Sequence, residues 1–218
     1  MRKKKNNQPL SGIKVFDLTR GLGGPTCTQI LGDLGAEIIK VERPITGDDS
    51  RNLGPPYLDR NARKPKESAY FLSVNRNKHS VTIDLTKKDG QDLAFKLIKK
   101  CDVIVENFRA GNLKQYGLDY ANVKQKNPKI IYCSNSGFGN SGPWSKHGKE
   151  RGSFDTISQA VSGAMASSGG GPSHTPVLAP WGLADQVGGL NFAVQILAGL
   201  VALEKKGVGQ KIECSQLG

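Results

Sequence analysis

A carboxylate followed closely by two glycines is the leading candidate for chemistry in this sequence. Asp185 precedes Gly188 and Gly189 and an apolar stretch with helical spacing, so it lies at or near a helix start. The helix dipole favours an ionised carboxylate there, and glycines let a bulky substrate or a backbone N–H come close. Asp is also a favoured helix N-cap, so the same pattern has a purely structural alternative.

Glycine-rich loops follow two of the apolar segments that are predicted to be strands. TRGLGGP comes after residues 13–18, and SGFGNSGP comes after residues 129–134. The first loop lacks the GxGxxG spacing, so the dinucleotide fingerprint is not met. It is either a weak phosphate-binding loop or a plain tight turn. Residues 46–67 predict a long irregular loop, and loops of that length tend to be functional.

The elements that must position these groups alternate between strand and helix. Strands are predicted at residues 13–18, 36–43, 80–85, 102–108, 129–134 and 210–217. Helices are predicted at residues 25–35, 86–100, 111–116, 120–126 and 154–166, and in the stretch after Asp185. This order predicts an α/β fold with a doubly wound parallel sheet, in which ligands bind at the carboxyl ends of the strands.

The composition favours a globular protein in the cytoplasm. Hydrophobic residues make up 37% of the chain, and no apolar run reaches about 18 residues without interruption, which predicts no membrane span. The four cysteines are far apart, without CxxC or Cys/His spacing, so we expect reduced core thiols and no metal site.

The net charge of +12 favours the binding of an anionic ligand or partner. Residues 1–9 form a basic tail that we expect to be disordered, and residues 10–218 form the folded part. No basic stripe with interleaved aromatic residues is present, so nucleic-acid binding would rest on charge alone. A phosphorylated small molecule accounts for the positive excess equally well. We therefore predict neither a nucleic-acid nor a membrane partner.

Eight segments, in order from Pro9 to the end of the chain, resemble the family III CoA-transferases of the CaiB/BaiF type. They are PLSGIKVFDLTRGLGGP, LGDLGAEIIKVERP, GDDSR, FLSVNRNKHSVTIDL, CDVIVENF, IIYCSNSGFGNSGP, SFDTISQAVSGAM and LADQVGGLNFAVQILAGL. The family includes formyl-CoA, carnitine CoA- and succinyl-CoA:glutarate CoA-transferases. The resemblance implies transfer of CoA from an acyl-CoA to a free carboxylic acid, a Rossmann-like large domain and a dimer of interlocked rings. CoA is then a substrate, not a permanently bound cofactor.

The resemblance also implies roles for individual residues around the reacting groups. Asp185, within LADQVGG, matches the family's nucleophile, which passes through an aspartyl anhydride and an aspartyl-CoA thioester. Asp155 matches a second carboxylate near the acyl pocket. Gly23, Gly24 and Phe154 match positions that contact the substrate.

Four further positions match residues that hold CoA in the family. Arg43 corresponds to the arginine at the adenine-nucleotide end, and Asn107 and Phe108 correspond to the pair that lines the CoA groove. Lys114 falls where the family commonly has a basic phosphate contact. Exposed Arg and Lys are by default solvated surface charges, so a structural alternative exists for both basic residues.

The sequence departs from the family pattern at two site positions. Leu22 stands where formyl-CoA transferases have glutamine, which disfavours a formyl or oxalate substrate. Phe154 stands where many members have tyrosine and where the racemases of the family have histidine. Phenylalanine cannot transfer a proton, so the sequence argues against racemisation. We expect an apolar acyl pocket that takes a dicarboxylic or larger acyl group such as succinyl.

Family members are considerably longer than 218 residues, and we expect the small second domain of the family to be absent from this sequence. Without the returning C-terminal segment the ring cannot close, so we expect exposed apolar surface and self-association, or a separately encoded second half. We also expect weak CoA binding and little turnover from the chain alone. A non-catalytic CoA- or nucleotide-binding module and an inactive fragment therefore remain alternatives.

Overall fold

The computed structural model describes residues 7–58, 67–146 and 152–217. Most of the predicted basic tail, residues 1–6, lies outside these ranges. Within them, six parallel strands form one sheet in the order β5-β2-β1-β6-β7-β8. Their bounds are Lys14–Asp17 (β1), Glu37–Glu42 (β2), Lys78–Thr82 (β5), Val103–Glu106 (β6), Ile131–Ser136 (β7) and Gln210–Ser215 (β8). The predicted α/β class with a parallel sheet is confirmed.

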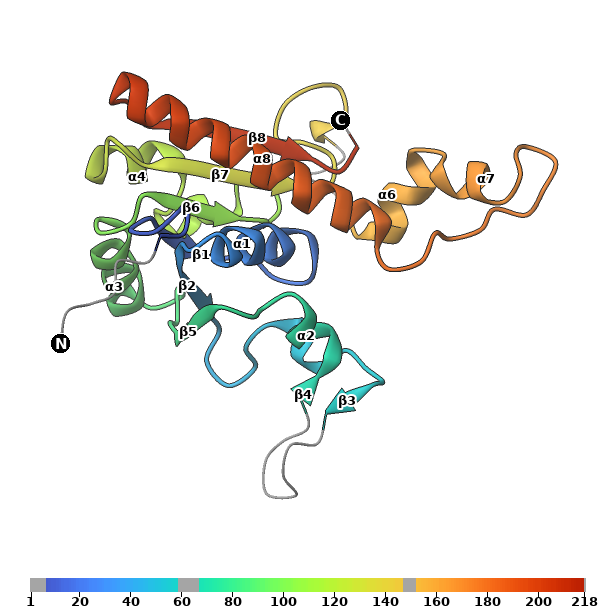
Figure 1. Cartoon of the computed structure of the whole chain (residues 1–218), viewed down its shortest axis with the longest axis horizontal. Coiled ribbons are helices and arrows are strands. Elements are labelled where there is room, and N and C mark those ends of the chain that lie inside the picture. The colour runs from blue at the N-terminus through green and yellow to red at the C-terminus, as the bar shows by residue number, and fades with distance from the viewer. Residues whose placement is uncertain (1–6, 59–66, 147–151, 218) are drawn as a thin grey trace.

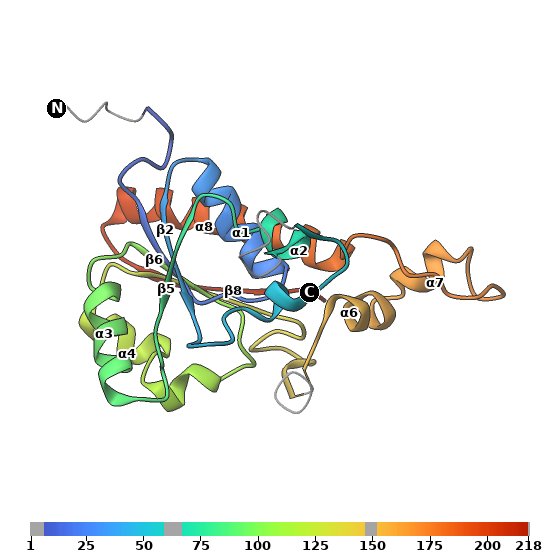
Figure 2. The ribbon, with the colours of Figure 1, turned by 90° about the horizontal axis from the view of Figure 1, so that it is seen from below.

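Helices cover both faces of this sheet (Figures 1 and 2). Helices α1 (Gly23–Asp33) and α8 (Leu183–Lys206) lie on one face, and α3 (Lys88–Ile98) and α4 (Tyr120–Lys126) lie on the other. Neighbouring strand residues point to opposite faces, so Val15 belongs to the core under α1 and α8, whereas Phe16 belongs to the core under α3 and α4. Two buried apolar layers therefore hold the sheet in place.

The strand order reverses at β1. The chain moves outward on one side through β2 and β5, then crosses to the other side of β1 and continues through β6, β7 and β8. The loops that leave the carboxyl ends of β1 and β6 consequently diverge, which leaves a crevice between them. A doubly wound sheet places its ligand at this position.

Several predicted elements differ from the observed ones. The interval read as one long loop contains the 3₁₀ turn η1 (Asp49–Asn52) and an antiparallel pair, β3 (Tyr57–Leu58) with β4 (Glu67–Ser68), and α2 (Ala69–Ser73) follows it directly. The segment at 111–116 is a 3₁₀ turn, η2 (Asn112–Tyr116). The single helix predicted at 154–166 is two helices, α6 (Asp155–Val161) and α7 (Ala164–Ser168), because Gly163 adopts a left-handed φ of 81° between them.

One side of α8 is apolar and exposed. The exposed apolar side chains on this side recur at the three- and four-residue spacing of one helix face. They include Leu183, Val187, Leu190, Val194 and Val201. The expectation of an exposed apolar surface is met here. Within the described ranges, α8 alone is long and apolar enough to pass a length-and-composition test for a membrane span. Its opposite side packs on α1 and β8, as a core helix does.

Candidate active site

A cavity of about 640 Å³ opens at the crevice between β1 and β6. Its walls come from segments far apart in the sequence: the loop after β1, the loop after β6, the end of β7, helix α2 and the starts of α6 and α8. Six of the nine predicted site residues line it, namely Gly24, Asn107, Phe108, Phe154, Asp155 and Asp185. The fold therefore gathers most of the predicted site at the expected edge of the sheet.

Asp185 lies in the first turn of α8, with its carboxylate at this cavity. Burial, and then the negative charge of Asp155, raise the pKa of Asp185 to about 6. Hydrogen bonds from the Gln216 side chain and the Gly23 backbone act in the opposite direction, because they favour the ionised form. At neutral pH the group is thus a carboxylate that is poorly solvated, a state that suits a nucleophile.

The N-cap interpretation of Asp185 is wrong, because another carboxylate caps the helix. Gly182 occupies the N-cap position with a left-handed φ of 64°. The Asp155 Oδ1 atom accepts hydrogen bonds from the backbone N–H groups of Ala184 at 2.8 Å and Asp185 at 3.1 Å. Asp155 therefore satisfies the first amides of α8 from the start of α6, which leaves the Asp185 side chain free for another role.

Replacing Asp155 with Asn should lower the pKa of Asp185 below about 6. The substitution removes one of the two causes that raise this pKa, while burial, the larger cause, remains. An Asn Oδ1 still accepts the two helix amides, so α8 should keep its start. The Asp185 carboxyl carbon can be titrated by ¹³C NMR, with Asp185→Asn used for assignment.

The control for this titration is Asp49→Asn. Asp49 lies on the wall of the same cavity, but its charge is not among the causes that shift Asp185. We expect that variant to leave the midpoint in place. An unchanged midpoint in Asp155→Asn would show that the charge of Asp155 does not act on Asp185.

The glycine loop after β1 allows α1 to approach Asp185 closely. A Cβ atom on Gly23 would lie 2.8 Å from Asp185 Oδ1, and one on Gly24 would lie 2.6 Å from the Thr19 Cβ. On α8, a Cβ on Gly189 would lie 2.5 Å from the Gly23 carbonyl oxygen. Gly189 is thus required for packing. The amides of Gly188 and Gly189 lie within α8, where they bond to carbonyls one turn earlier, so neither is a free oxyanion donor.

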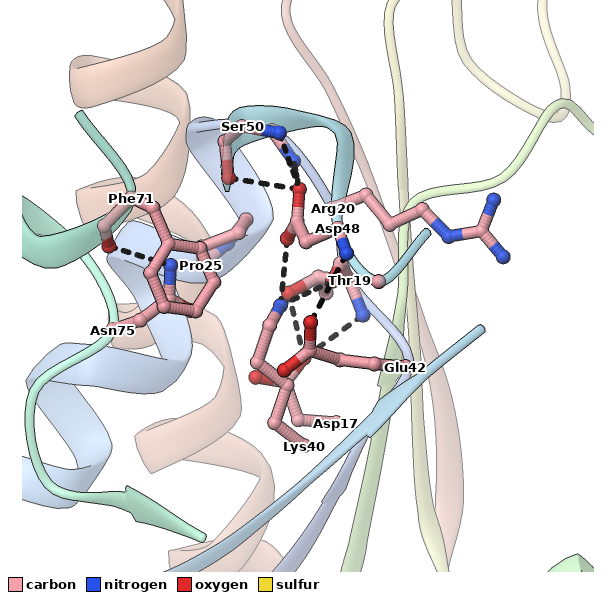
Figure 3. A network of polar contacts seen from close by, with 12 residues as sticks. Asp17, Thr19, Arg20, Pro25, Lys40, Glu42, Asp48, Ser50, Phe71 and Asn75 are labelled. Atoms are coloured by element: carbon pink, nitrogen blue, oxygen red, sulfur yellow. Dashed lines mark hydrogen bonds and ion pairs between the residues drawn. The ribbon is translucent and has the colours of Figure 1, made fainter. Parts of the chain in front are cut away.

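A buried polar network holds the glycine loop after β1 in place (Figure 3). The Lys40 ammonium, on a side chain only 1% exposed, donates to the Thr19 carbonyl and to Asp48 Oδ2, both at 2.8 Å. Asp48 Oδ1 in turn accepts from the Gly21 amide at 3.2 Å. Burial opposes ionisation of Asp48, but the charge and hydrogen bond of Lys40, together with hydrogen bonds from Ser50, lower the pKa of Asp48. The loop after β1 is therefore held at both Thr19 and Gly21.

A second buried pair continues this network under α1. The Lys78 ammonium lies 3.3 Å from an Asp17 carboxylate oxygen and donates to the Pro25 carbonyl at 2.9 Å. Burial lowers the pKa of Lys78 to about 8 despite the attraction of Asp17. Thr28 also donates to Asp17, at 2.6 Å. The first turn of α1 is thereby attached to the carboxyl end of β1.

The two residues after β6, Asn107 and Phe108, both contact Arg20. Asn107 bonds its backbone, and the ring of Phe108 lies against its side chain. The Asn107 amide accepts from the Arg20 N–H at 2.9 Å and donates to its carbonyl at 2.8 Å. The Arg20 guanidinium carbon lies 4.7 Å from the centre of the Phe108 ring. Asn107 thus lines the cavity while its amide holds the glycine loop, and contact with CoA remains a prediction for it.

The two predicted basic residues lie outside the main cavity. Arg43 lines an adjoining cavity of about 330 Å³, which shares Arg20, Phe108 and Asn112 with the first. Its guanidinium pairs with Asp49. Lys114 lines a different cavity of about 410 Å³, which shares Arg109 with the main cavity. The structure therefore places both basic residues in cavities that adjoin the main one, and their phosphate contacts remain predictions.

Three site residues were not anticipated from the sequence. Arg20 lies between the two adjoining cavities, and its position inside TRGLGG was the only signal. Tyr70 lines the main cavity from α2, and burial followed by the charge of Asp185 raises its pKa to about 12, so it stays a neutral hydroxyl. Gln216 reaches Asp185 from the end of β8. Neither of the last two has a local sequence signal.

Several known proteins are similar to this chain in sequence and in structure. Succinyl-CoA:glutarate CoA-transferase of Homo sapiens is 43% identical over 97% of this chain and 46% of its own length. Succinate–glutarate CoA-transferase of Agrobacterium fabrum is 40% identical over 96% of this chain and 51% of its own. A crystal structure of a CaiB/BaiF family protein from Brucella suis superposes with a TM-score of 0.88 at 40% identity, covering 97% of this chain and 54% of that one.

The chain spans about half the length of these relatives. The model of the family described as CoA-transferase family III matches residues 10–218, which is nearly the whole chain. The match includes the glycine loop, the cavity and Asp185, and the fold agrees with that of the Brucella protein. This chain therefore belongs to CoA-transferase family III.

Proposed function

We propose that the protein transfers coenzyme A from an acyl-CoA to a free carboxylic acid, with Asp185 as the nucleophile. The observation that carries the proposal is a carboxylate with a raised pKa at a cavity on the carboxyl edge of the sheet, in a chain of this family. Above about pH 6 the carboxylate is ionised and poorly solvated, so attack on an electrophilic carbonyl is favoured. CoA enters as a substrate.

In the first step, an Asp185 oxygen attacks the thioester carbon. The new C–O bond forms, the C–S bond breaks, and a mixed anhydride and the CoA thiolate result. In the second step, the thiolate attacks the Asp185 Cγ atom, and the original acyl group leaves as a carboxylate. The acceptor acid then repeats both steps in reverse, so no net proton or electron is required.

The acyl pocket favours a succinyl or similar dicarboxylic group. Leu22 and Phe154 supply apolar surface, and Phe154 is 73% exposed at the start of α6. Arg20 and Arg109 lie on the wall of the same cavity, and their charge attracts an anionic substrate. The names of the human and Agrobacterium relatives, which pair succinate with glutarate, support this substrate class.

CoA would extend from Asp185 toward Arg43 across Arg20 and Phe108. Those two residues line both the main and the adjoining cavity, so the two cavities are neighbours along the proposed direction. Arg43 would meet the adenine-nucleotide end, and Lys114 a phosphate. A cytoplasmic location and, for the full-length protein, a homodimer are parts of the same proposal.

Isotope exchange tests the proposed reaction and its specificity. Succinyl-CoA is mixed with the protein and a panel of ¹⁴C-labelled acids, and label entering the CoA ester fraction is followed. We expect exchange with succinate and glutarate to exceed exchange with oxalate or formate, because Leu22 and Phe154 give no polar partner for a small acid. Oxalate as the best acceptor by tenfold or more would contradict the specificity, and exchange with no acid would contradict the function.

A second candidate is a CoA-binding protein that needs a partner for turnover. The exposed apolar side of α8 favours it, because contiguous apolar surface commonly marks an interaction site. Binding of CoA without exchange, followed by exchange when a second polypeptide is added, would support this candidate.

A further inference from the structure

The side chain of Gln216 lies between Asp185 and a buried serine. Its Nε2 atom donates to Asp185 Oδ1, and its Oε1 atom accepts from Ser158 Oγ at 2.7 Å. Ser158 is 1% exposed, and its hydroxyl oxygen lies 3.1 Å from that of Ser153. An ionised carboxylate only accepts hydrogen bonds, so the NH₂ end of the Gln216 amide must face Asp185.

The Gly23 backbone also lies against the Asp185 carboxylate. A Cβ atom on Gly23 would lie 2.8 Å from Asp185 Oδ1, and the Gly23 backbone hydrogen-bonds the carboxylate. The backbone of Gln216 is also anchored, because its N–H donates to the Ser136 carbonyl at 3.1 Å. Gln216 therefore occupies Asp185 Oδ1, and we assign the attack to the other carboxylate oxygen, Oδ2.

We propose that Gln216 is a catalytic residue that stabilises the oxyanion formed on Asp185 itself. The inference rests on the proposed function, in which Asp185 becomes acylated. Oδ2 forms the bond to the acyl carbon, so Oδ1 becomes the carbonyl oxygen of the aspartyl anhydride. Gln216 Nε2 then donates to Oδ1 throughout the next step.

In that step the CoA sulfur attacks the Asp185 Cγ atom. The C–S bond forms, and the electron pair of the carbonyl moves to Oδ1, where the Gln216 amide donates its hydrogen bond. The pair then returns, the Cγ–Oδ2 bond breaks, and Oδ2 leaves in the released carboxylate. No proton is transferred by Gln216. Removing one such donor typically lowers a rate by about 10²–10³-fold.

Gln216→Met tests the proposal in a single turnover. The chain is mixed with succinyl-CoA, quenched with acid at intervals, and the CoA adduct on the Asp185 peptide is followed by mass spectrometry. We expect the rate of adduct formation to fall about 100-fold. Gln195→Met is the matched control: Gln195 lies on α8, where its amide reaches Cys214 Sγ at 3.7 Å and not Asp185. That variant should retain the original rate.

Two further readouts test the role of Gln216, and the second, a titration, does not depend on turnover. Ser158→Ala leaves the Gln216 amide in place but removes its orienting partner, so a smaller loss of rate is expected. In ¹³C titrations of Gln216→Met, the pKa of Asp185 should rise above about 6, because a hydrogen bond to the ionised form is lost.

The possible outcomes test the proposed function and the role of Gln216 separately. Absence of any adduct on the unsubstituted chain overturns the proposed function, and this inference with it. An adduct that forms on Gln216→Met at the original rate, within about threefold, overturns the role of Gln216 alone. A 100-fold loss confined to Gln216→Met, with Gln195→Met unaffected, supports the role.

Discussion

Replacing Asp185 with Asn should abolish CoA adduct formation and, at neutral pH, make the protein more stable. The first effect follows because Asn supplies no nucleophilic carboxylate. The second follows because folding raises the pKa of Asp185 from 3.8 to about 6. Its contribution to stability is fully present below pH 3.8 and is lost as pH rises to about 6, so the ionised group costs about 2–3 kcal/mol above that pH. Asn removes this cost.

Urea unfolding at pH 4 and pH 8 measures the second effect. We expect Asp185→Asn to raise the free energy of unfolding at pH 8 and to change it little at pH 4. Asp92→Asn, which removes an exposed carboxylate on α3, serves as the control and should have a small effect at both values. A loss of stability at pH 8 in Asp185→Asn would contradict the raised pKa.

Gly189→Ala should destabilise the protein and displace the glycine loop from Asp185. The new Cβ atom would lie 2.5 Å from the Gly23 carbonyl oxygen, which is backbone and cannot move alone. Helices α1 and α8 must then separate, and overpacking of this kind costs about 1–3 kcal/mol. Because the Gly23 backbone also bonds the Asp185 carboxylate, the same shift should weaken the site.

The neighbouring Gly188→Ala provides a matched control. The nearest atom to a Cβ at Gly188 is the Gln216 Cγ at 3.7 Å, an ordinary contact. Alanine has a higher helix propensity than glycine by about 1 kcal/mol, so this variant should be as stable as the parent or more so. Urea unfolding of the two variants side by side checks the contrast. Equal stabilities would show that α1 and α8 do not pack as described.

Local patterns in the sequence were sufficient for much of the fold. The apolar runs and glycine loops predicted the six strands and most helices, because each depends on neighbours in sequence. The break at Gly163 and the short elements between Asp48 and Ser73 were not predicted. They depend on one left-handed residue and on contacts with distant segments, neither of which has a periodic signal.

The candidate site was likewise predictable from the sequence only in part. Asp185 and the glycine loop have recognisable local patterns, whereas the partners that orient them come from elsewhere in the fold. Asp155 caps α8 from a separate helix, and Gln216 reaches Asp185 only because β8 lies beside β7. Lys40 is a charged residue in the middle of an apolar strand, and only the structure shows its burial against Asp48.

Mapping the covalent intermediate tests the central claim most directly. The chain is incubated with succinyl-CoA, treated with hydroxylamine, digested and analysed by mass spectrometry. The account predicts a hydroxamate on Asp185 that is absent in Asp185→Asn and in samples without acyl-CoA. Modification at another residue, at the same level in Asp185→Asn, would contradict it.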